Sequence, residues 1–373
     1  MGTEVERITM KRKKLCYILP LYDPSTDTHY AYLYDFLIQV AKEVELFVIV
    51  EKASTAPKEL KKKAKVYVQK FSFLPFRLVE NMLCVFFVRM TGFKYFYSHY
   101  TYIGALSAIS ITKIFGGKTF YWNCGMPWLY ATQGMKERVF RFILRNSYLV
   151  TGTEDVARDY ARVYELKDEN IRIIPNWINT KDGPGNVLSK SVARQILGVR
   201  QDTYAILFIH HLSKRKGTHK LIPIATKLRE KTRCVFLIVG DGEERTVLEK
   251  EIKEKELGET IHIVGKIPHK DISVYYRAAD AFLMPSDEEG FPHVLLEASL
   301  YELPYVVADV GGVRDISPQE ESPYIIEKDN ILGYRDALLR IRDDVKIREA
   351  IVENVKKYDT ENALSQFIQL LTT

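Results

Sequence analysis

Residues 281–298 constrain the fold more than any other stretch, because three local patterns follow one another there. Residues 281–284 are uniformly apolar, which is typical of a buried strand. Pro285 and Gly290 then interrupt regular structure, and Pro292 suits the first turn of a helix, where its missing N–H costs nothing. The stretch therefore predicts a strand, an acidic loop and a helix.

Two glutamates flank this turn. Glu289 lies in the loop, and Glu297 lies about 7 Å beyond the helix start at a rise of about 1.5 Å per residue. Each carboxylate could bind one of two hydroxyl-bearing rings that are joined by phosphates, with the helix N-terminus facing the negative charge. The alternative is a capping carboxylate and an exposed helical glutamate, which the E-x7-E spacing alone would favour.

The neighbours of the two glutamates favour a ligand site. The loop continues as G-F-P after Glu289, and alanine follows Glu297. This segment resembles the signature of the retaining glycosyltransferases of family 4, which have the GT-B fold. The resemblance implies that Glu289 contacts the donor sugar and that Glu297 contacts the ribose. It also implies that the diphosphate meets the backbone of Gly290, Phe291, Pro292 and His293.

The composition fits an intracellular two-domain protein. The chain has 373 residues, of which 46% are hydrophobic and 27% charged, and this length suits two domains. The four cysteines are far apart and form no C-x-x-C pair, which suits a reducing compartment. No signal-peptide pattern opens the sequence, and its longest nearly apolar run, 100–112, is too short to span a bilayer. We therefore expect a cytoplasmic location.

Alternating strand and helix patterns predict an α/β fold with two doubly wound, Rossmann-like domains facing a central cleft, which is the GT-B architecture. We expect residues 1–178 to form an acceptor-binding domain and residues 190–355 to form a donor-binding domain for a nucleotide sugar. A polar, glycine-containing linker separates them. The family resemblance implies that a last helix, at about 360–373, packs back on the first domain.

Ligands of doubly wound sheets bind at the carboxyl ends of the strands. Five glycine-containing loops of the second domain follow predicted strands there, and glycine allows a backbone to approach a phosphate or a flat base. These loops are 210–217, 240–243, 265–268, 285–293 and 309–313. Beyond the E-x7-E segment, the donor-binding candidates in them are His211, Gly240, Gly242, Gly265 and Lys266.

A basic run, K-R-K-G at 214–217, precedes a predicted helix. Cations beside a helix N-terminus make a diphosphate site, although an ordinary solvated charge run is the alternative. The resemblance implies a basic pair here, commonly an arginine several residues before Lys-Gly. Lys216 matches the lysine, whereas His211 stands at the arginine position, so Arg215 could supply the second charge. Charge develops on the leaving phosphate, so we expect Lys216, Arg215 and Glu289 to be the catalytic residues.

No D-x-D triplet occurs in the sequence. Transferases that hold the donor diphosphate through a divalent metal generally need such carboxylates, so we expect protein cations and helix dipoles to replace the metal. We expect no cofactor, and a UDP-, GDP- or ADP-sugar as the donor.

The first domain offers weaker candidates for the acceptor side. The family often has a histidine in the loop that here holds Asn123, and His99, at the end of the preceding strand, is the nearest substitute. Trp128 could stack on a sugar or a lipid. A satisfied strand-end histidine and a core tryptophan are the alternatives. The expected acceptor is a saccharide or a lipid-linked molecule.

Positive charge is concentrated in the first half of the chain. The net charge is +6, yet residues 1–180 carry 26 Lys and Arg against 17 Asp and Glu, a net +9. Residues 58–70 hold six lysines and precede the aromatic stretch 71–76, a combination that suits an anionic membrane surface. We therefore predict reversible peripheral binding to the cytoplasmic membrane face. A solvated loop over a normal core segment is the alternative, and nucleic acid is disfavoured because no nucleic-acid motif accompanies the charge.

The sequence is thus interpreted as a retaining, metal-independent glycosyltransferase of hexosyltransferase type. We expect it to act in cell-surface polysaccharide or glycolipid synthesis. A nucleotide-sugar epimerase of the same fold is one alternative. A non-catalytic nucleotide-binding scaffold is the other, because the family's usual residues are absent from the positions of His211 and Asn123.

Overall fold

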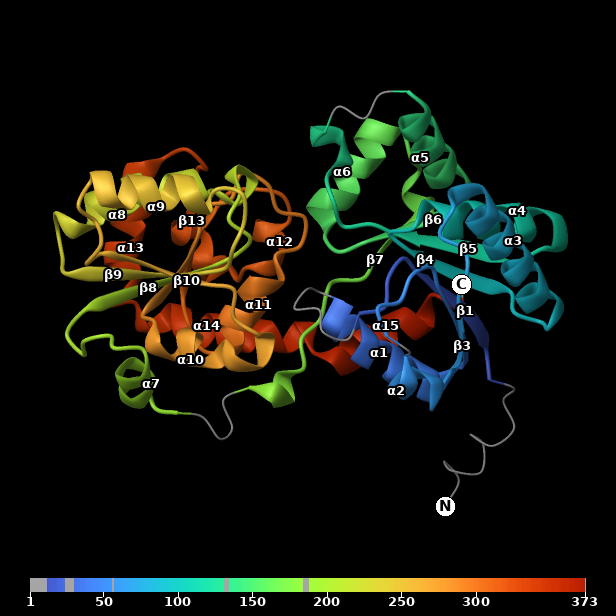
Figure 1. Ribbon diagram of the computed structural model, residues 1–373, viewed down its shortest axis with the longest axis horizontal. Helices are drawn as coiled ribbons and strands as arrows, with labels where there is room; N and C mark the ends of the chain where they lie inside the picture. The colour runs from blue at the N-terminus through green and yellow to red at the C-terminus, as the bar shows by residue number, and fades with distance from the viewer. Residues whose placement is uncertain (1–11, 24–29, 56, 131–133, 184–187, 373) are drawn as a thin grey trace, which may run out of the picture. The chain divides into compact units, whose positions relative to one another are not determined.

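The computed structural model describes residues 12–23, 30–55, 57–130, 134–183 and 188–372, in two compact units that each contain one parallel sheet (Figure 1). The first unit consists of the chain up to residue 152, residues 156–174 and the segment from residue 361. The second unit consists of residues 153–155 and 175–360. The two predicted doubly wound α/β domains are confirmed.

The sheet of the first unit has seven parallel strands in the order β3-β2-β1-β4-β5-β6-β7. Its strands are β1 Lys14–Leu19, β2 Glu45–Val50, β3 Lys65–Val68, β4 Tyr95–His99, β5 Lys118–Trp122, β6 Tyr148–Thr151 and β7 Ile171–Ile173. The helices of this unit are α1 Tyr30–Glu43, α2 Lys58–Lys61, α3 Leu74–Met90, α4 Tyr102–Phe115, α5 Met135–Asn146, α6 Glu154–Tyr164 and the last helix, α15 Thr360–Gln369. Strand order reverses between β1 and β4, which is where doubly wound folds bind ligands.

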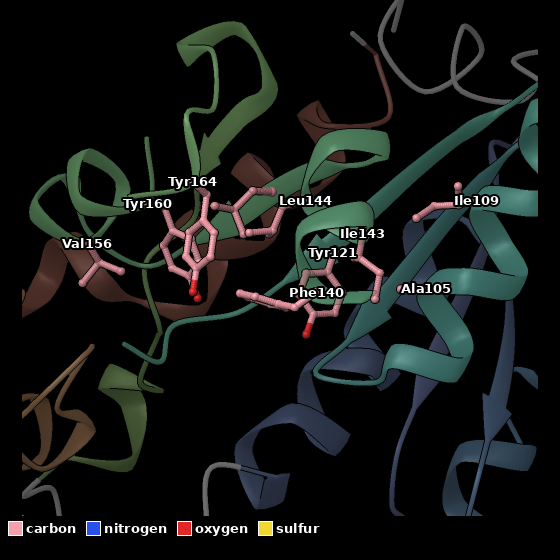
Figure 2. Close-up of a cluster of buried hydrophobic side chains, with 10 residues drawn as sticks. Ala105, Ile109, Tyr121, Phe140, Ile143, Leu144, Val156, Tyr160 and Tyr164 are labelled. Carbon is pink, nitrogen blue, oxygen red and sulfur yellow. The ribbon is translucent and has the colours of Figure 1, made fainter. Parts of the chain in front are cut away.

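A cluster of aromatic side chains forms part of the first unit's core (Figure 2). Tyr121 of β5, Phe140 of α5, and Tyr160 and Tyr164 of α6 are each at most 2% exposed. The ring of Phe140 lies edge-on to that of Tyr164, with centroids 5.3 Å apart. Because such rings bury large apolar areas, this cluster holds α5 and α6 against the sheet.

The sheet of the second unit has six parallel strands in the order β10-β9-β8-β11-β12-β13. Its strands are β8 Tyr204–Ile209, β9 Cys234–Val239, β10 Ile261–Gly265, β11 Ala281–Met284, β12 Tyr305–Ala308 and β13 Ile325–Ile326. Its helices are α7 Lys190–Ile196, α8 Thr218–Arg229, α9 Arg245–Glu254, α10 Ser273–Ala278, α11 His293–Leu300, α12 Val313–Ile316, α13 Ile331–Ile341 and α14 Val345–Val355. In Figure 1, α8 and α9 lie on one side of this sheet, and α10 and α14 on the other.

The strand, acidic loop and helix predicted for residues 281–298 are confirmed. The strand is β11, all four of its residues are buried, and α11 begins at His293 directly after Pro292. Across the described part of the chain, no helix combines the length and the apolar character that crossing a bilayer requires.

Candidate functional site

Glu289 is buried at the carboxyl edge of the second sheet, in the loop that joins β11 to α11. Its side chain is 5% exposed and lies between three polar groups. Lys216 Nζ is 2.6 Å from Glu289 Oε1, and the Ser286 hydroxyl donates a hydrogen bond of 2.8 Å to the same oxygen. His210 Nε2 lies 3.3 Å from that oxygen. The structure therefore brings together two of the predicted catalytic residues, Glu289 and Lys216.

The loop that carries Lys216 is fixed against the Glu289 loop by their backbones. Lys216 ends a 3₁₀ turn, Lys214–Lys216, and Gly217 follows with φ of 73°. A Cβ atom at Gly217 would lie 2.1 Å from the Pro285 carbonyl oxygen, so only glycine allows this approach. The Asp287 N–H also donates to the Arg215 carbonyl over 2.9 Å. These contacts hold the lysine beside the carboxylate.

The electrostatics of this group favour a charged Lys216–Glu289 pair beside a neutral histidine. Burial would raise the pKa of Glu289, but the combined interactions with Lys216, His210 and the Ser286 hydroxyl outweigh burial. The pKa therefore lies below its usual value, and the carboxylate is ionised at neutral pH. Burial, reinforced by the charge of Lys216, lowers the pKa of His210 to about 3. His210 is therefore uncharged at neutral pH, and its contact with Glu289 is not an ion pair.

Glu297 lies inside α11 and is also buried. The Tyr276 hydroxyl donates a hydrogen bond of 2.6 Å to Oε2, while His269 Nε2 and His293 Nδ1 lie 3.4 and 3.7 Å from Oε1. Burial would raise the pKa of Glu297, but the hydrogen bond from His269, followed by the interactions of His293, holds it well below its usual range. A second ionised carboxylate thus stands at this edge of the sheet.

The other predicted residues of the basic loop point elsewhere. Arg215 has a half-exposed side chain, and its Nη1 is 3.7 Å from Glu288 Oε1. His211 is exposed and pairs with Glu243 at 2.8 Å. The structure therefore brings neither Arg215 nor His211 to the carboxylate of Glu289.

The remaining donor-side candidates lie in the loops where they were expected. Gly240 follows β9, and a Cβ there would lie 1.9 Å from the His210 carbonyl oxygen, so this glycine serves loop packing within the protein. Gly242 lies in the same loop, Gly265 ends β10, and Lys266 is exposed. Phe291 is buried, with its ring 5.9 Å from that of Tyr358.

The acceptor-side candidates in the first unit make internal contacts. His99 Nδ1 is 2.8 Å from the Tyr17 hydroxyl, and its ring stacks on Trp122 at 4.3 Å. Asn123 Oδ1 accepts a hydrogen bond of 2.8 Å from the Gly125 N–H. Trp128 packs edge-on against the Tyr160 ring at 5.0 Å and thereby joins the aromatic core. Acceptor roles for these residues stay predictions.

Sequence reasoning missed several groups of both units. His210 was not predicted as a site residue, because the sequence does not show which of two adjacent histidines faces inward; alternation at the strand end places only His210 beside Glu289. His269 and Tyr276 belong to other segments than Glu297, so no local pattern links them. In the first unit, buried Glu51 accepts a hydrogen bond from the Thr101 hydroxyl at the carboxyl edge of the sheet.

Tyr100 adjoins that edge with unusual backbone geometry. It lies between β4 and α4 with φ of 58°, a conformation that costs energy for a residue with a side chain. Its hydroxyl accepts a hydrogen bond of 3.3 Å from the Cys124 N–H. Strained residues of this kind often mark binding sites, and no sequence signal predicted this one.

Comparison with known proteins identifies the fold. Residues 189–358 match the family model described as glycosyl transferases group 1, which covers most of the second unit. A structure of the Anabaena protein HepE in complex with UDP and glucose superimposes with a TM-score of 0.76 at 18% identity, over 96% of this chain and 99% of that one. The chain therefore has the fold of the GT-B glycosyltransferases.

Two curated relatives are each 27% identical to this chain over the residues that align. One is an uncharacterised glycosyltransferase of Methanocaldococcus jannaschii, matched over 56% of this chain and 54% of its own length. The other is the Escherichia coli UDP-Gal:alpha-D-GlcNAc-diphosphoundecaprenol alpha-1,3-galactosyltransferase, matched over 47% of this chain and 46% of its own length. The chain thus spans about half the length of the curated relatives it matches.

Within the described residues, no group of three or more His, Cys, Asp and Glu side chains is arranged to hold a metal ion. The expected independence from metal stays a prediction that chelation can test.

Proposed function

We propose that the protein is a retaining glycosyltransferase of family 4 that moves a sugar from a nucleotide sugar to an acceptor hydroxyl. The observation that carries the proposal is the buried Lys216–Glu289 pair, which stands at the carboxyl edge of the sheet inside the segment matched by the glycosyl transferase family model. Buried charges at a ligand-binding edge are costly to maintain, and such groups cluster at functional sites.

The pair has a direct role when a donor binds. Lys216 and Glu289 neutralise each other through their direct contact. A donor diphosphate would compete for the lysine ammonium, which frees the Glu289 carboxylate to accept hydrogen bonds from the sugar hydroxyls. Glu297, held ionised by its histidine neighbours, would accept hydrogen bonds from the ribose hydroxyls. In this proposal, the two glutamates bind the two ends of the donor, which is the arrangement that the E-x7-E spacing suggested.

Sugar transfer would then proceed without a covalent enzyme intermediate. The bond between the anomeric carbon and the diphosphate oxygen breaks, and the electron pair leaves with the diphosphate. The acceptor oxygen attacks the same face of the sugar, and its proton passes to the departing phosphate. Negative charge on the leaving group is stabilised by Lys216 and the loop N–H groups, with no metal required.

Two comparisons support a choice of donor and acceptor. UDP is the nucleotide in the HepE complex, and the E. coli relative acts on a diphosphoundecaprenol-linked sugar. We therefore infer a UDP-sugar donor and an acceptor in the synthesis of a glycolipid or a cell-surface polysaccharide. The acceptor would bind at the first unit, where Glu51, Thr101 and Tyr100 gather at the sheet edge.

A ligand screen followed by product analysis tests the proposal. Thermal shift with UDP, GDP, ADP and their sugars identifies the donor, because a ligand that binds only the folded state raises stability. Transfer to candidate acceptors is then followed by NMR of the anomeric linkage. A product with the donor's anomeric configuration supports retention, whereas free epimerised sugar without an acceptor would indicate an epimerase. Nucleotide binding without any turnover would indicate a scaffold.

A further inference from the structure

Helix α3 exposes an apolar stripe along its outward side. The stripe consists of Phe76, Val79, Leu83, Phe87 and Met90, which recur at helical spacing and are each 48–63% exposed. The opposite side of the same helix is also apolar, and it is buried through Val85 and Val88. Exposed apolar patches of this kind usually mark an interaction surface. We therefore expect the outward side of this helix, which is apolar on both sides, to contact another apolar surface.

An apolar groove runs beside this stripe. It has a volume of about 640 Å³ and lies between α3 and the strands β2 and β3, the latter being the edge strand of the first sheet. Its lining includes Phe47, Tyr67, Phe71 and Phe93 together with stripe residues. A groove of this size and composition suits hydrocarbon chains.

Basic side chains outnumber acidic ones near the groove, although Glu80 also lines it and Lys65 pairs with Glu45 at 3.2 Å. Lys65 and Lys70 line it, and the exposed lysines 58, 61, 62 and 63 belong to α2 and the turn that leads into β3. Residues 51–100 contain three acidic side chains, of which Glu51 and Glu80 are buried. Glu59 is thus the single exposed carboxylate of that stretch, which the structure describes except for residue 56.

We propose that this face of the first unit docks on a bilayer that contains anionic lipid. The stripe enters the acyl region, the groove takes acyl chains, and the lysines contact the head groups. A second copy of the chain would bring the same lysines against this face, so like charges oppose a symmetric dimer. The proposal is independent of the glycosyltransferase chemistry, because none of these side chains belongs to the site around Glu289.

Co-sedimentation with vesicles tests the proposal on the full chain. Wild type should bind vesicles of phosphatidylcholine and phosphatidylglycerol at low salt, bind pure phosphatidylcholine at least tenfold more weakly, and retain a salt-resistant fraction on the anionic vesicles. Replacing Phe76, Leu83 and Phe87 with serine should abolish the salt-resistant fraction and lower the remaining affinity at least tenfold. The matched control replaces three exposed apolar residues of the second unit, Ile196, Val247 and Val345, with serine and should bind as wild type does.

Hydrogen exchange of the wild-type protein provides a measurement that needs no variant. Addition of anionic vesicles should slow exchange in residues 71–90 and leave α8 and α9 unchanged. Three results would each overturn the proposal: wild type that does not bind anionic vesicles, a stripe variant that binds them as tightly as the control, or a wild-type dimer in solution that the stripe substitutions dissociate.

The role of the lysines is tested separately. Replacing Lys61, Lys62 and Lys63 with glutamate should remove the preference for anionic lipid, and an unchanged preference would refute the role given to the lysines.

Discussion

At the scale of single residues, the site depends on one buried carboxylate that stays ionised. Glu289 contacts Lys216, Ser286 and His210 through a single oxygen, Oε1, and within the described residues Oε2 takes no part in these contacts. This geometry leaves one edge of the carboxylate available to a ligand. A substitution that keeps the shape but removes the charge therefore separates chemistry from folding.

We expect Glu289→Gln to lower turnover by about 10²-fold or more while nucleoside diphosphate affinity stays within a few-fold of wild type, since a preorganised electrostatic contact contributes about 10²–10³ to the rate. Steady-state kinetics with the donor found by thermal shift, together with calorimetric titration of the nucleoside diphosphate, measure the two quantities. The control is Glu288→Gln, which changes the neighbouring carboxylate. Near-normal turnover of the Glu289 variant would remove this residue from the site.

Lys216 and Arg215 are expected to differ although they are adjacent. The Lys216 side chain is 12% exposed and contacts Glu289, whereas Arg215 is 49% exposed and lies near Glu288. Lys216→Ala should therefore weaken UDP binding at least tenfold more than it weakens uridine binding, and Arg215→Ala should have the smaller effect. Isothermal titration with both ligands, with and without EDTA, checks this. Equal losses for nucleoside and diphosphate would show that Lys216 is structural, and an absolute metal requirement would contradict the proposed site.

His210 makes the stability of the second unit depend on pH. Its pKa is about 3 in the folded protein and 6.5 without burial. Between these two pH values, the unfolded chain therefore binds a proton at this histidine and the folded chain does not. Its contribution to stability is therefore complete above pH 6.5 and is lost as the pH falls from 6.5 towards 3. Glu289, whose folded pKa is also lowered, contributes in the same direction only below about its unperturbed value of 4.5.

We therefore expect His210→Gln to flatten the dependence of unfolding free energy on pH between 7.5 and 5.0. Urea unfolding at several pH values in that window measures the slope. His211→Gln is the matched control, because it makes the same substitution at the adjacent, exposed histidine. The interpretation fails if both variants keep the wild-type slope.

At the scale of elements, the fold was more predictable than the site. Buried parallel strands such as β2 and β11 appear as short apolar runs, so their positions follow from the sequence. Helix α3 was not predicted from the sequence, because apolar residues on two sides of a helix obscure the 3.6-residue period of an amphipathic helix. The sequence predicted that Glu289 and Lys216 lie at the same edge of the sheet. It could not predict their direct contact, because 73 residues separate them.

The junction between the two site loops provides an element-scale prediction. Gly217 combines a positive φ with a close approach to Pro285, whereas Gly198 has φ of 67° and open space around its Cβ position. Gly198→Ala should cost about 1 kcal/mol for the left-handed backbone alone. Gly217→Ala should cost clearly more and also weaken nucleotide binding, because the Lys216 turn must shift. Chemical unfolding and titration of UDP measure both effects, and equal costs for the two variants would show that the close approach relaxes freely.

At the scale of the whole molecule, the chain returns to its first unit at its end. Residues 361–373 belong with the first unit, although the preceding residues belong with the second. Phe367 of α15 is 2% exposed, and its ring lies 5.0 Å from Tyr97 and 5.5 Å from Phe36. Lys13 Nζ also donates a hydrogen bond of 2.8 Å to the Leu371 carbonyl. The last helix therefore completes the core of a unit whose other residues lie more than 180 positions earlier in the chain.

Phe367→Ala should destabilise the first unit by about 3–5 kcal/mol, the usual cost of truncating a buried aromatic side chain. Each unit has its own sheet and core, so we expect scanning calorimetry to show two transitions and only one of them to move to lower temperature. A nucleotide that binds the Glu289 site should raise the other transition, which assigns it to the second unit. Gln366→Ala, one position earlier and exposed, is the matched control and should leave both transitions in place. If Phe367→Ala lowers both transitions equally, the two units unfold as one cooperative body, and the last helix stabilises the whole chain rather than the first unit.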